Sequence, residues 1–290
     1  MQRVTLPRPE GARHCLVDAP GPRGDGRRPL VILLHGAGAS ARQVMGLGFP
    51  PSPLSAWRDI AARERLVVIA ADARRGWNDC FASDAAVARQ DDVAFVAAII
   101  DHAIAEHDVD ADRVFVVGVS RGGLLAYRVA VEIPRRLAGF SAVLAGMAPP
   151  GRAAEPEVPL PALIVGATAD PLMPYEGGKR WYTLGFMEPV RGIEDSVRAW
   201  CGLAGLTGAP RVTVLPCRQP SDRTRTTHLL WGDDPAGLQV ALFRIEGGGH
   251  AEPSPSRRYP AWINALAGPQ GAALETAEAQ WAFFEPKQRA

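Results

Sequence analysis

The sequence has 290 residues, 47% of them hydrophobic, and its formal net charge is +1 at pH 7. A chain of this length can bury a large core, and we expect residues 1–290 to form one domain. No run of Lys or Arg interleaved with aromatic residues is present, which argues against nucleic acid as a partner. No apolar segment is long enough to span a membrane, and residues 1–20 lack the apolar core of a signal peptide, so we expect a cytoplasmic protein.

Short apolar runs along the chain predict strands that are buried on both faces of a sheet. After an outer strand at 13–18, they lie at residues 30–34, 66–71, 113–117, 140–147, 162–166 and 238–245. Helices are predicted between and after these strands, at residues 54–65, from 91, between 120 and 134, at 192–204 and at 274–284. Residues 205–237 are mostly Gly, Pro and polar, with one short strand expected at 212–215. Strands that alternate with helices predict an α/β fold with a mostly parallel central sheet and helices on both faces.

Residues Gly118-Val119-Ser120-Arg121-Gly122 form a Gly-x-Ser-x-Gly motif between a predicted buried strand and a predicted helix. A turn this sharp strains the backbone at the serine, and the glycines remove side chains that would collide where strand and helix meet. By itself the motif also fits a glycine-rich turn whose serine only caps the helix. The strand before it and the helix after it favour a nucleophile elbow.

Three predicted strand ends present Ser120, Asp170 and His250, in that order along the chain. Because catalytic groups of α/β sheets gather at the carboxyl ends of the strands, we expect these three side chains to meet. A serine hydroxyl needs a base to take its proton, and we assign this role to His250, oriented by Asp170. Asp170 precedes Pro171 and could instead only start a turn, in which case Asp195 is the alternative acid.

An ester carbonyl oxygen gains negative charge during attack, and each backbone N–H aimed at it contributes about 2.7–4 kcal/mol. We expect one such donor from Arg121 and the second from Ala37, in the loop after the first buried strand. The same loop places Gly36, Gly38 and Ala41 at the spacing of a dinucleotide-binding fingerprint. No acidic residue follows at the required place, so we do not expect NAD(P) or another cofactor.

The chain has four cysteines, which are Cys15, Cys80, Cys201 and Cys217. They form no C-x-x-C pair and have no histidine at ligand spacing, so we expect no structural zinc or other metal. Free thiols are expected, although a bridge between Cys201 and Cys217 is sterically conceivable.

On the basis of these residues, the chain resembles the polyhydroxybutyrate depolymerase and feruloyl esterase group of α/β-hydrolases. The motifs that carry the resemblance are Leu34-His35-Gly36, Gly76-Trp77-Asn78, Asp91-Asp92-Val93, residues 112–123, residues 170–178 and Gly247-Gly248-Gly249-His250. The resemblance implies the α/β-hydrolase fold, a triad of Ser120, Asp170 and His250, and hydrolysis of a carboxylic ester. One departure is Glu252-Pro253, which stands where members of the group often have Trp-Pro after the histidine.

We expect a soluble ester with a short or aromatic acyl group as the substrate, because no added domain or linker for docking on a polymer is evident. The aromatic residues expected to shape its pocket are Trp77 and Trp181, with Tyr182 and Phe186 near the latter. Alternatives on the same architecture are a depolymerase of polyhydroxyalkanoate oligomers, a prolyl-oligopeptidase-like peptidase, a thioesterase, a dienelactone-type hydrolase or a noncatalytic binding protein. The sequence predicts no oligomeric state.

Overall fold

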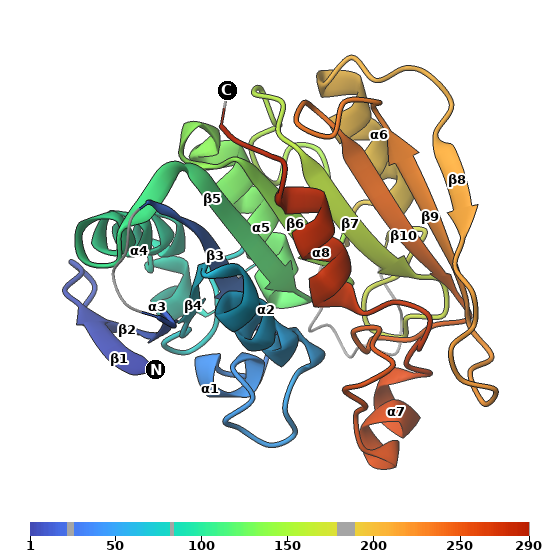
Figure 1. Ribbon diagram of the computed structural model, residues 1–290, viewed down its shortest axis with the longest axis horizontal. Coiled ribbons are helices and arrows are strands. Elements are labelled where there is room, and N and C mark those ends of the chain that lie inside the picture. Colours follow the sequence, from blue (N-terminus) through green and yellow to red (C-terminus); the bar gives the residue numbers. More distant parts are fainter. Residues whose placement is uncertain (22–25, 82–83, 179–188, 290) are drawn as a thin grey trace.

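The computed structural model describes residues 1–21, 26–81, 84–178 and 189–289. In this part of the chain, ten strands form one sheet in the order β1-β2-β4-β3-β5-β6-β7-β10-β9-β8 (Figure 1). The strands are β1 (Gln2–Leu6), β2 (Arg13–Asp18), β3 (Arg28–Leu34), β4 (Val67–Ala71), β5 (Val109–Val119), β6 (Gly139–Val143), β7 (Ala162–Ala167), β8 (Arg211–Val214), β9 (Arg225–Trp231) and β10 (Val240–Glu246).

The six central strands, from β4 to β10 in the sheet order, are parallel to one another. Antiparallel strands extend both edges, with β2 and β1 beside β4, and β9 and β8 beside β10. The predicted mostly parallel sheet is therefore confirmed. Because the central strands are parallel, their carboxyl ends lie along one edge, near α1 and α7 in Figure 1.

Helices cover both faces of the sheet, as predicted (Figure 1). One face carries α2 and α8, and the other carries α4, α5 and α6. The helices are α1 (Ala41–Val44), α2 (Trp57–Glu64), α3 (Ala85–Ala88), α4 (Asp92–Glu106), α5 (Arg121–Glu132), α6 (Ile193–Leu203), α7 (Ala261–Ala267) and α8 (Thr276–Phe284), with 3₁₀ helices η1 (Pro53–Ala56) and η2 (Pro134–Arg136).

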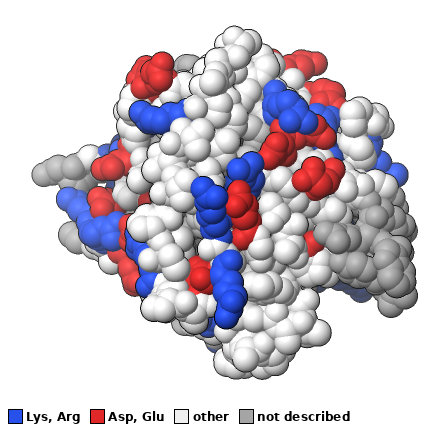
Figure 2. All heavy atoms as spheres, turned by 90° about the vertical axis from the view of Figure 1, so that its right-hand side faces the viewer, with Lys and Arg blue, Asp and Glu red and all other residues white. Residues whose placement is uncertain are grey.

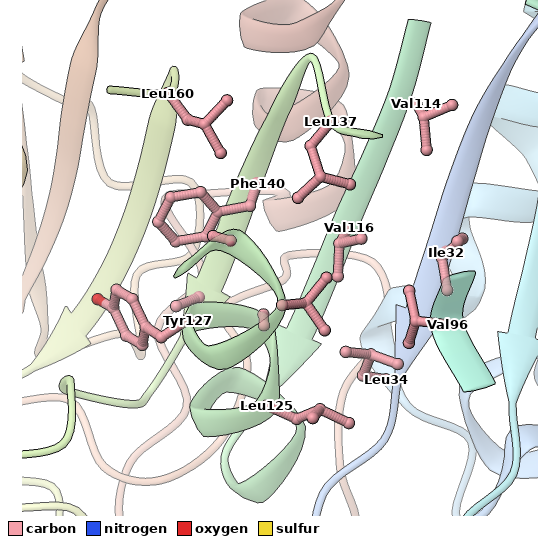
Figure 3. Packing of buried hydrophobic residues seen from close by; sticks show 14 of the residues in the cluster. Ile32, Leu34, Val96, Val114, Val116, Leu125, Tyr127, Leu137, Phe140 and Leu160 are labelled. Atoms are coloured by element: carbon pink, nitrogen blue, oxygen red, sulfur yellow. The ribbon is translucent and has the colours of Figure 1, made fainter. Parts of the chain in front are cut away.

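The central strands are mostly apolar where helices cover both faces of the sheet. In β3, Ile32 and Leu34 pack into the layer of α4 and α5, whereas Val31 and Leu33 face the layer of α2 and α8. Figure 3 shows the first of these layers, where Ile32 and Leu34 lie close to Val96 of α4. The alternation follows from the two-residue repeat of a strand, and it buries a core on each face of the sheet.

Several short elements were not predicted from the sequence. β9 (Arg225–Trp231) lies within the stretch expected to be mostly loop, because its first half is polar and carries no apolar run. It pairs with β10 along its length, with His228 stacked on Phe243 at 4.3 Å between ring centroids. β1, α1, α3 and α7 were also not predicted. α7 leaves Trp262 and Leu266 exposed instead of burying an apolar stripe.

Two other elements have bounds that differ from the predicted ones, and the backbone conformation explains each difference. The strand expected at 140–147 ends at Val143, because Leu144 has a φ of 53° and turns the chain away from the strand direction. The helix expected at 54–65 is divided into η1 and α2, and it ends at Arg65 in the left-handed conformation.

The cysteines and the surface charge are the remaining features of the fold. Cys15, Cys80, Cys201 and Cys217 are all free thiols, so the conceivable bridge is not formed. On the face shown in Figure 2, basic and acidic side chains are intermixed, with uncharged residues between them. Among the described residues, no helix has the length and apolar character needed to cross a membrane.

Candidate active site

Ser120 stands at a sharp turn between β5 and α5. Its φ of 55° and ψ of −120° lie outside the regions that side-chain-bearing residues ordinarily adopt. The two motif glycines make the turn sterically feasible: a Cβ on Gly118 would lie 1.9 Å from the Gly122 carbonyl oxygen, and one on Gly122 would lie 2.1 Å from the Leu34 carbonyl oxygen. The Ser120 N–H donates to the Val143 carbonyl at 2.8 Å, which fixes the turn against β6. The local geometry is that of a nucleophile elbow.

The structure brings together the three residues that the sequence placed at strand ends. Ser120 Oγ lies 2.8 Å from His250 Nε2, and His250 Nδ1 lies 2.7 Å from Asp170 Oδ2. Asp170 follows β7 and His250 follows β10, the neighbouring strand. The two contacts form one hydrogen-bonded chain from the hydroxyl through the imidazole to the carboxylate.

The Asp170 carboxylate is buried and held in one orientation. Its Oδ1 atom accepts hydrogen bonds from the backbone N–H groups of Leu172 and Met173, both at 2.8 Å, while Oδ2 faces His250. The alternative acid, Asp195, lies in the first turn of α6 with its side chain half exposed and paired with Arg198. The geometry therefore supports Asp170 as the partner of the imidazole.

The loop that carries His250 is packed tightly against the segment before α8. A Cβ on Gly249 would lie 2.2 Å from the Ala267 carbonyl oxygen, so only glycine allows this approach. Burial lowers the pKa of His250, but the charge and hydrogen bond of Asp170 and the charge of Glu252 raise it, and the net pKa is above the ordinary 6.5. The imidazole is thus kept close to Ser120 and made a stronger base.

Ala37 and Arg121 present backbone N–H groups beside Ser120. Among the described residues, neither N–H donates to a backbone or side-chain acceptor. Ala37 belongs to a loop that runs past the serine, since a Cβ on Gly36 would lie 3.4 Å from the Ser120 Cβ. Both donors are therefore free to bind an oxygen of a substrate.

The loop before Ala37 is fixed by buried hydrogen bonds of His35. Its Nδ1 donates to the Gly36 carbonyl at 2.8 Å, and its Nε2 accepts from the Ala73 N–H at 3.1 Å. This pattern requires the neutral imidazole, and burial, as the largest effect, lowers the pKa of His35. The histidine thus serves to position the loop.

Trp77, expected to touch the substrate, is 2% exposed and belongs to the hydrophobic core. Its indole N–H donates to the His35 carbonyl at 2.8 Å, so it also holds the Ala37 loop. Trp77 is also one of the residues that line a cavity together with Ala37 and Arg121. Trp181, Tyr182 and Phe186 lie outside the described residues.

Sequence reasoning missed the partner of the Arg121 side chain. Its guanidinium binds the buried Asp79 carboxylate through two contacts, Nε to Oδ2 at 2.5 Å and Nη2 to Oδ1 at 2.8 Å. Burial raises the pKa of Asp79 to about 6, whereas the charge of Arg121 lowers it. The pair attaches the residue after Ser120 to the loop beyond Trp77. The Gly-Trp-Asn motif was the only sign of this loop in the sequence.

Ser120 and His250 open into a cavity of about 250 Å³, which we call the Ser120 cavity. Its wall includes three residues that the sequence analysis did not assign, Ser52, Glu252 and Tyr259. Ser52 is 200 residues from Glu252, and only Glu252 had been noticed, as a departure from Trp-Pro. Among the described residues, no group of three or more His, Cys, Asp or Glu side chains could hold a metal ion.

The chain matches the family described as alpha/beta hydrolase family over residues 31–276. "Putative esterase NocK" from Nocardia uniformis subsp. tsuyamanensis is 31% identical, over 87% of this chain and 73% of that protein. Feruloyl esterase B from Piromyces equi is 26% identical, over 83% of this chain but 43% of its own length, and confirms the predicted resemblance.

Among solved structures, the acetyl xylan esterase from Aspergillus awamori superposes with a TM-score of 0.56 at 13% identity. The superposition covers 91% of this chain and 98% of that one, and it shows a shared fold. With the family match over most of the chain and the elbow at the end of β5, the protein belongs to the α/β hydrolase family.

Proposed function

We propose that the protein is a serine carboxylic ester hydrolase in which Ser120 is the nucleophile, His250 the general base and Asp170 the residue that orients the imidazole. The single observation that carries the proposal is the hydrogen-bonded chain of 2.8 Å and 2.7 Å that links the three side chains. The similarity to NocK and to feruloyl esterase B supports an ester as the substrate. The one continuous sheet also supports the expectation that residues 1–290 form a single domain.

In the acylation step, His250 Nε2 takes the proton of Ser120 while Oγ attacks the ester carbonyl carbon. The carbonyl oxygen becomes negatively charged, and the N–H groups of Ala37 and Arg121 stabilise it. The protonated His250 then donates its proton to the leaving alkoxide, which departs as the alcohol and leaves an acyl-serine. A water molecule, activated by the same imidazole, attacks the acyl-serine, and collapse of the second intermediate releases the acid and restores Ser120.

We further propose a small, soluble ester with a short or aromatic acyl group. The Ser120 cavity, at about 250 Å³, limits the group that it holds to a small one, which supports a small ester. The name of feruloyl esterase B, a relative of this chain, supports the aromatic alternative. Trp77 and Trp181 remain the aromatic residues proposed to contact the substrate.

The test is to compare kcat/KM for p-nitrophenyl esters from acetate to dodecanoate, for methyl ferulate and for a polyhydroxybutyrate film, in the wild type and in Ser120→Ala. We expect the acetate, the butyrate or methyl ferulate to be the best substrate, and turnover in Ser120→Ala to fall by about 10⁶-fold. Best activity on the dodecanoate or the film would contradict the substrate proposal alone. Near-wild-type turnover in Ser120→Ala would contradict the mechanism.

A further inference from the structure

Glu252 places a buried carboxylate in the wall of the Ser120 cavity. The residue is 4% exposed, although the cavity is open to the substrate side of Ser120 and His250. Its Oε1 accepts from the Ser52 hydroxyl at 2.8 Å, and its Oε2 accepts from the Tyr259 hydroxyl at 2.9 Å. Both partners line the same cavity, and both are neutral.

In the described part of the chain, the carboxylate of Glu252 has no Lys or Arg partner. Within the part of the chain that the structure describes, no Lys or Arg nitrogen lies within 4.0 Å of its carboxylate oxygens. Buried charges in proteins are normally paired, because removing them from water is costly. A glutamine could bond the hydroxyls of Ser52 and Tyr259 without that cost. Apart from the His250 imidazolium, whose pKa the charge of Glu252 raises, no cation of the described chain faces this carboxylate, so a positive group of a substrate can pair with it.

The position of Glu252 indicates which part of the ester carries the positive charge. During acylation, His250 Nε2 gives its proton to the leaving alkoxide, so the alcohol part of the substrate lies beside His250. Glu252 is two residues further along, and its charge acts on the imidazole. The Ser120 cavity is thus on the alcohol side of the reacting bond.

The other lining residues fit an alcohol group that carries a positive charge and is otherwise apolar. Leu172 and Ile263 are apolar residues of the cavity wall. Tyr259 adds an aromatic ring to the wall, and aromatic rings attract alkylammonium groups. Among the residues that line the Ser120 cavity, Glu252 is the one carboxylate, and no Lys or Arg is present. The cavity on the other side of the Ala37 loop instead contains Arg74, Arg75 and Arg121.

We propose that Glu252 makes the enzyme selective for esters whose alcohol part carries a positive charge, such as an alkylammonium group. This inference rests on the proposed esterase function and adds the charge of the alcohol to it. The cation binds in the Ser120 cavity beside the carboxylate, between Tyr259 and the apolar wall.

The test uses two acetate esters of nearly the same shape, acetylcholine and 3,3-dimethylbutyl acetate, which differ in a positive nitrogen against a neutral carbon. Each kcat/KM is divided by the hydroxide-catalysed rate constant of the same ester, which removes the difference in intrinsic reactivity. In the wild type we expect the charged ester to be preferred by about tenfold or more, equivalent to about 1.4 kcal/mol. In Glu252→Gln we expect the ratio to fall to within about twofold of one.

Glu278→Gln is the matched control, because it changes the net charge equally at an exposed position on α8 that pairs with Arg63. It should keep the wild-type ratio. The ratio cancels any general loss of activity in Glu252→Gln. Equal values of kcat/KM, each divided by its hydroxide rate constant, for the two esters in the wild type would overturn the inference. An unchanged ratio of these values in Glu252→Gln would overturn it as well.

Calorimetric titration of the wild type with choline and with 3,3-dimethylbutanol gives a readout that needs neither turnover nor the variant. We expect choline to bind at least about tenfold more tightly, and equal affinities would overturn the inference. The failure of the underlying function is distinguishable, because it would appear as ester hydrolysis that persists in Ser120→Ala. A preference for choline in the absence of ester turnover would support the cation site and contradict the esterase.

Discussion

His250 and Asp170 are joined by a contact of 2.7 Å between Nδ1 and Oδ2, while Oδ1 of the same carboxylate already accepts two backbone N–H groups. The carboxylate therefore cannot rotate freely, and it presents one oxygen to the imidazole. This arrangement holds Nδ1 as the protonated nitrogen and leaves Nε2 to accept the proton of Ser120.

Asp170→Asn tests this orienting role. An amide can present its NH₂ to Nδ1 and so favours the wrong tautomer of His250, and we expect kcat to fall by about 10⁴-fold with a smaller change in KM. Asp195→Asn, at the half-exposed alternative acid, should retain near-wild-type kcat. Steady-state kinetics of the two variants decide between the acids, and a larger loss in Asp195→Asn would refute the assignment of Asp170.

The pH dependence of kcat/KM follows from the environment of His250. Burial lowers its pKa, but Asp170 and Glu252 raise it more, so that the net pKa is above 6.5. Only the neutral imidazole can take the serine proton. Activity should therefore rise with pH through an apparent pKa above 6.5 and then level off, as measured with a neutral ester such as p-nitrophenyl acetate.

Glu252→Gln changes this profile in a defined direction. Removing its negative charge destabilises the imidazolium, so the pKa of His250 should fall and the rising limb should move to lower pH. Glu278→Gln, which removes a remote exposed carboxylate, should leave the limb in place. A shift to higher pH in Glu252→Gln, or a flat profile in the wild type, is incompatible with this account when chemistry limits the rate.

Asp79→Ala should destabilise the protein strongly. The substitution leaves the Arg121 guanidinium without its buried partner, and breaking such a pair typically costs about 3–5 kcal/mol. Asp101→Ala removes an exposed pair with Arg136 and should cost about 0–1 kcal/mol. Urea unfolding followed by circular dichroism measures both free energies of unfolding, and similar values for the two variants would show that the Asp79 pair does not hold the elbow.

Trp77→Phe separates a positioning role from contact with the substrate. The variant keeps an aromatic ring but loses the N–H that binds the His35 carbonyl, which should lower the free energy of unfolding by about 1–3 kcal/mol. If Trp77 acts by holding the Ala37 loop, kcat should fall by a similar factor for acetate and ferulate esters, with little change in KM. A rise in KM confined to the ferulate ester would instead show direct contact with the acyl group.

The central sheet and the meeting of Ser120, Asp170 and His250 could be predicted because each depends on a local signal. Ser120, Asp170 and His250 each follow an apolar run, and parallel strands bring their carboxyl ends to one edge whatever the distance along the chain. The Gly-x-Ser-x-Gly motif also contains the two glycines that make the sharp turn at Ser120 possible, and these are visible in the sequence. These signals needed no knowledge of which side chains meet in space.

The wall of the Ser120 cavity could not be predicted in the same way. Ser52 and Glu252 are 200 residues apart, and both lie in irregular segments that no strand or helix pattern positions. Tyr259 precedes α7, whose exposed Trp262 and Leu266 give no periodic signal. The pair of Asp79 and Arg121 was hidden for the same reason, because the buried loop that carries Asp79 has no regular structure.

The most direct test of the account is covalent labelling with a fluorophosphonate probe, followed by intact-mass and peptide mass spectrometry. The probe reacts with a serine only where a neighbouring base activates the hydroxyl. We predict one adduct per wild-type chain, located on Ser120, and no adduct in Ser120→Ala at the same probe concentration. Equal labelling of Ser120→Ala, or an active wild-type enzyme that remains unlabelled, would contradict Ser120 as the nucleophile.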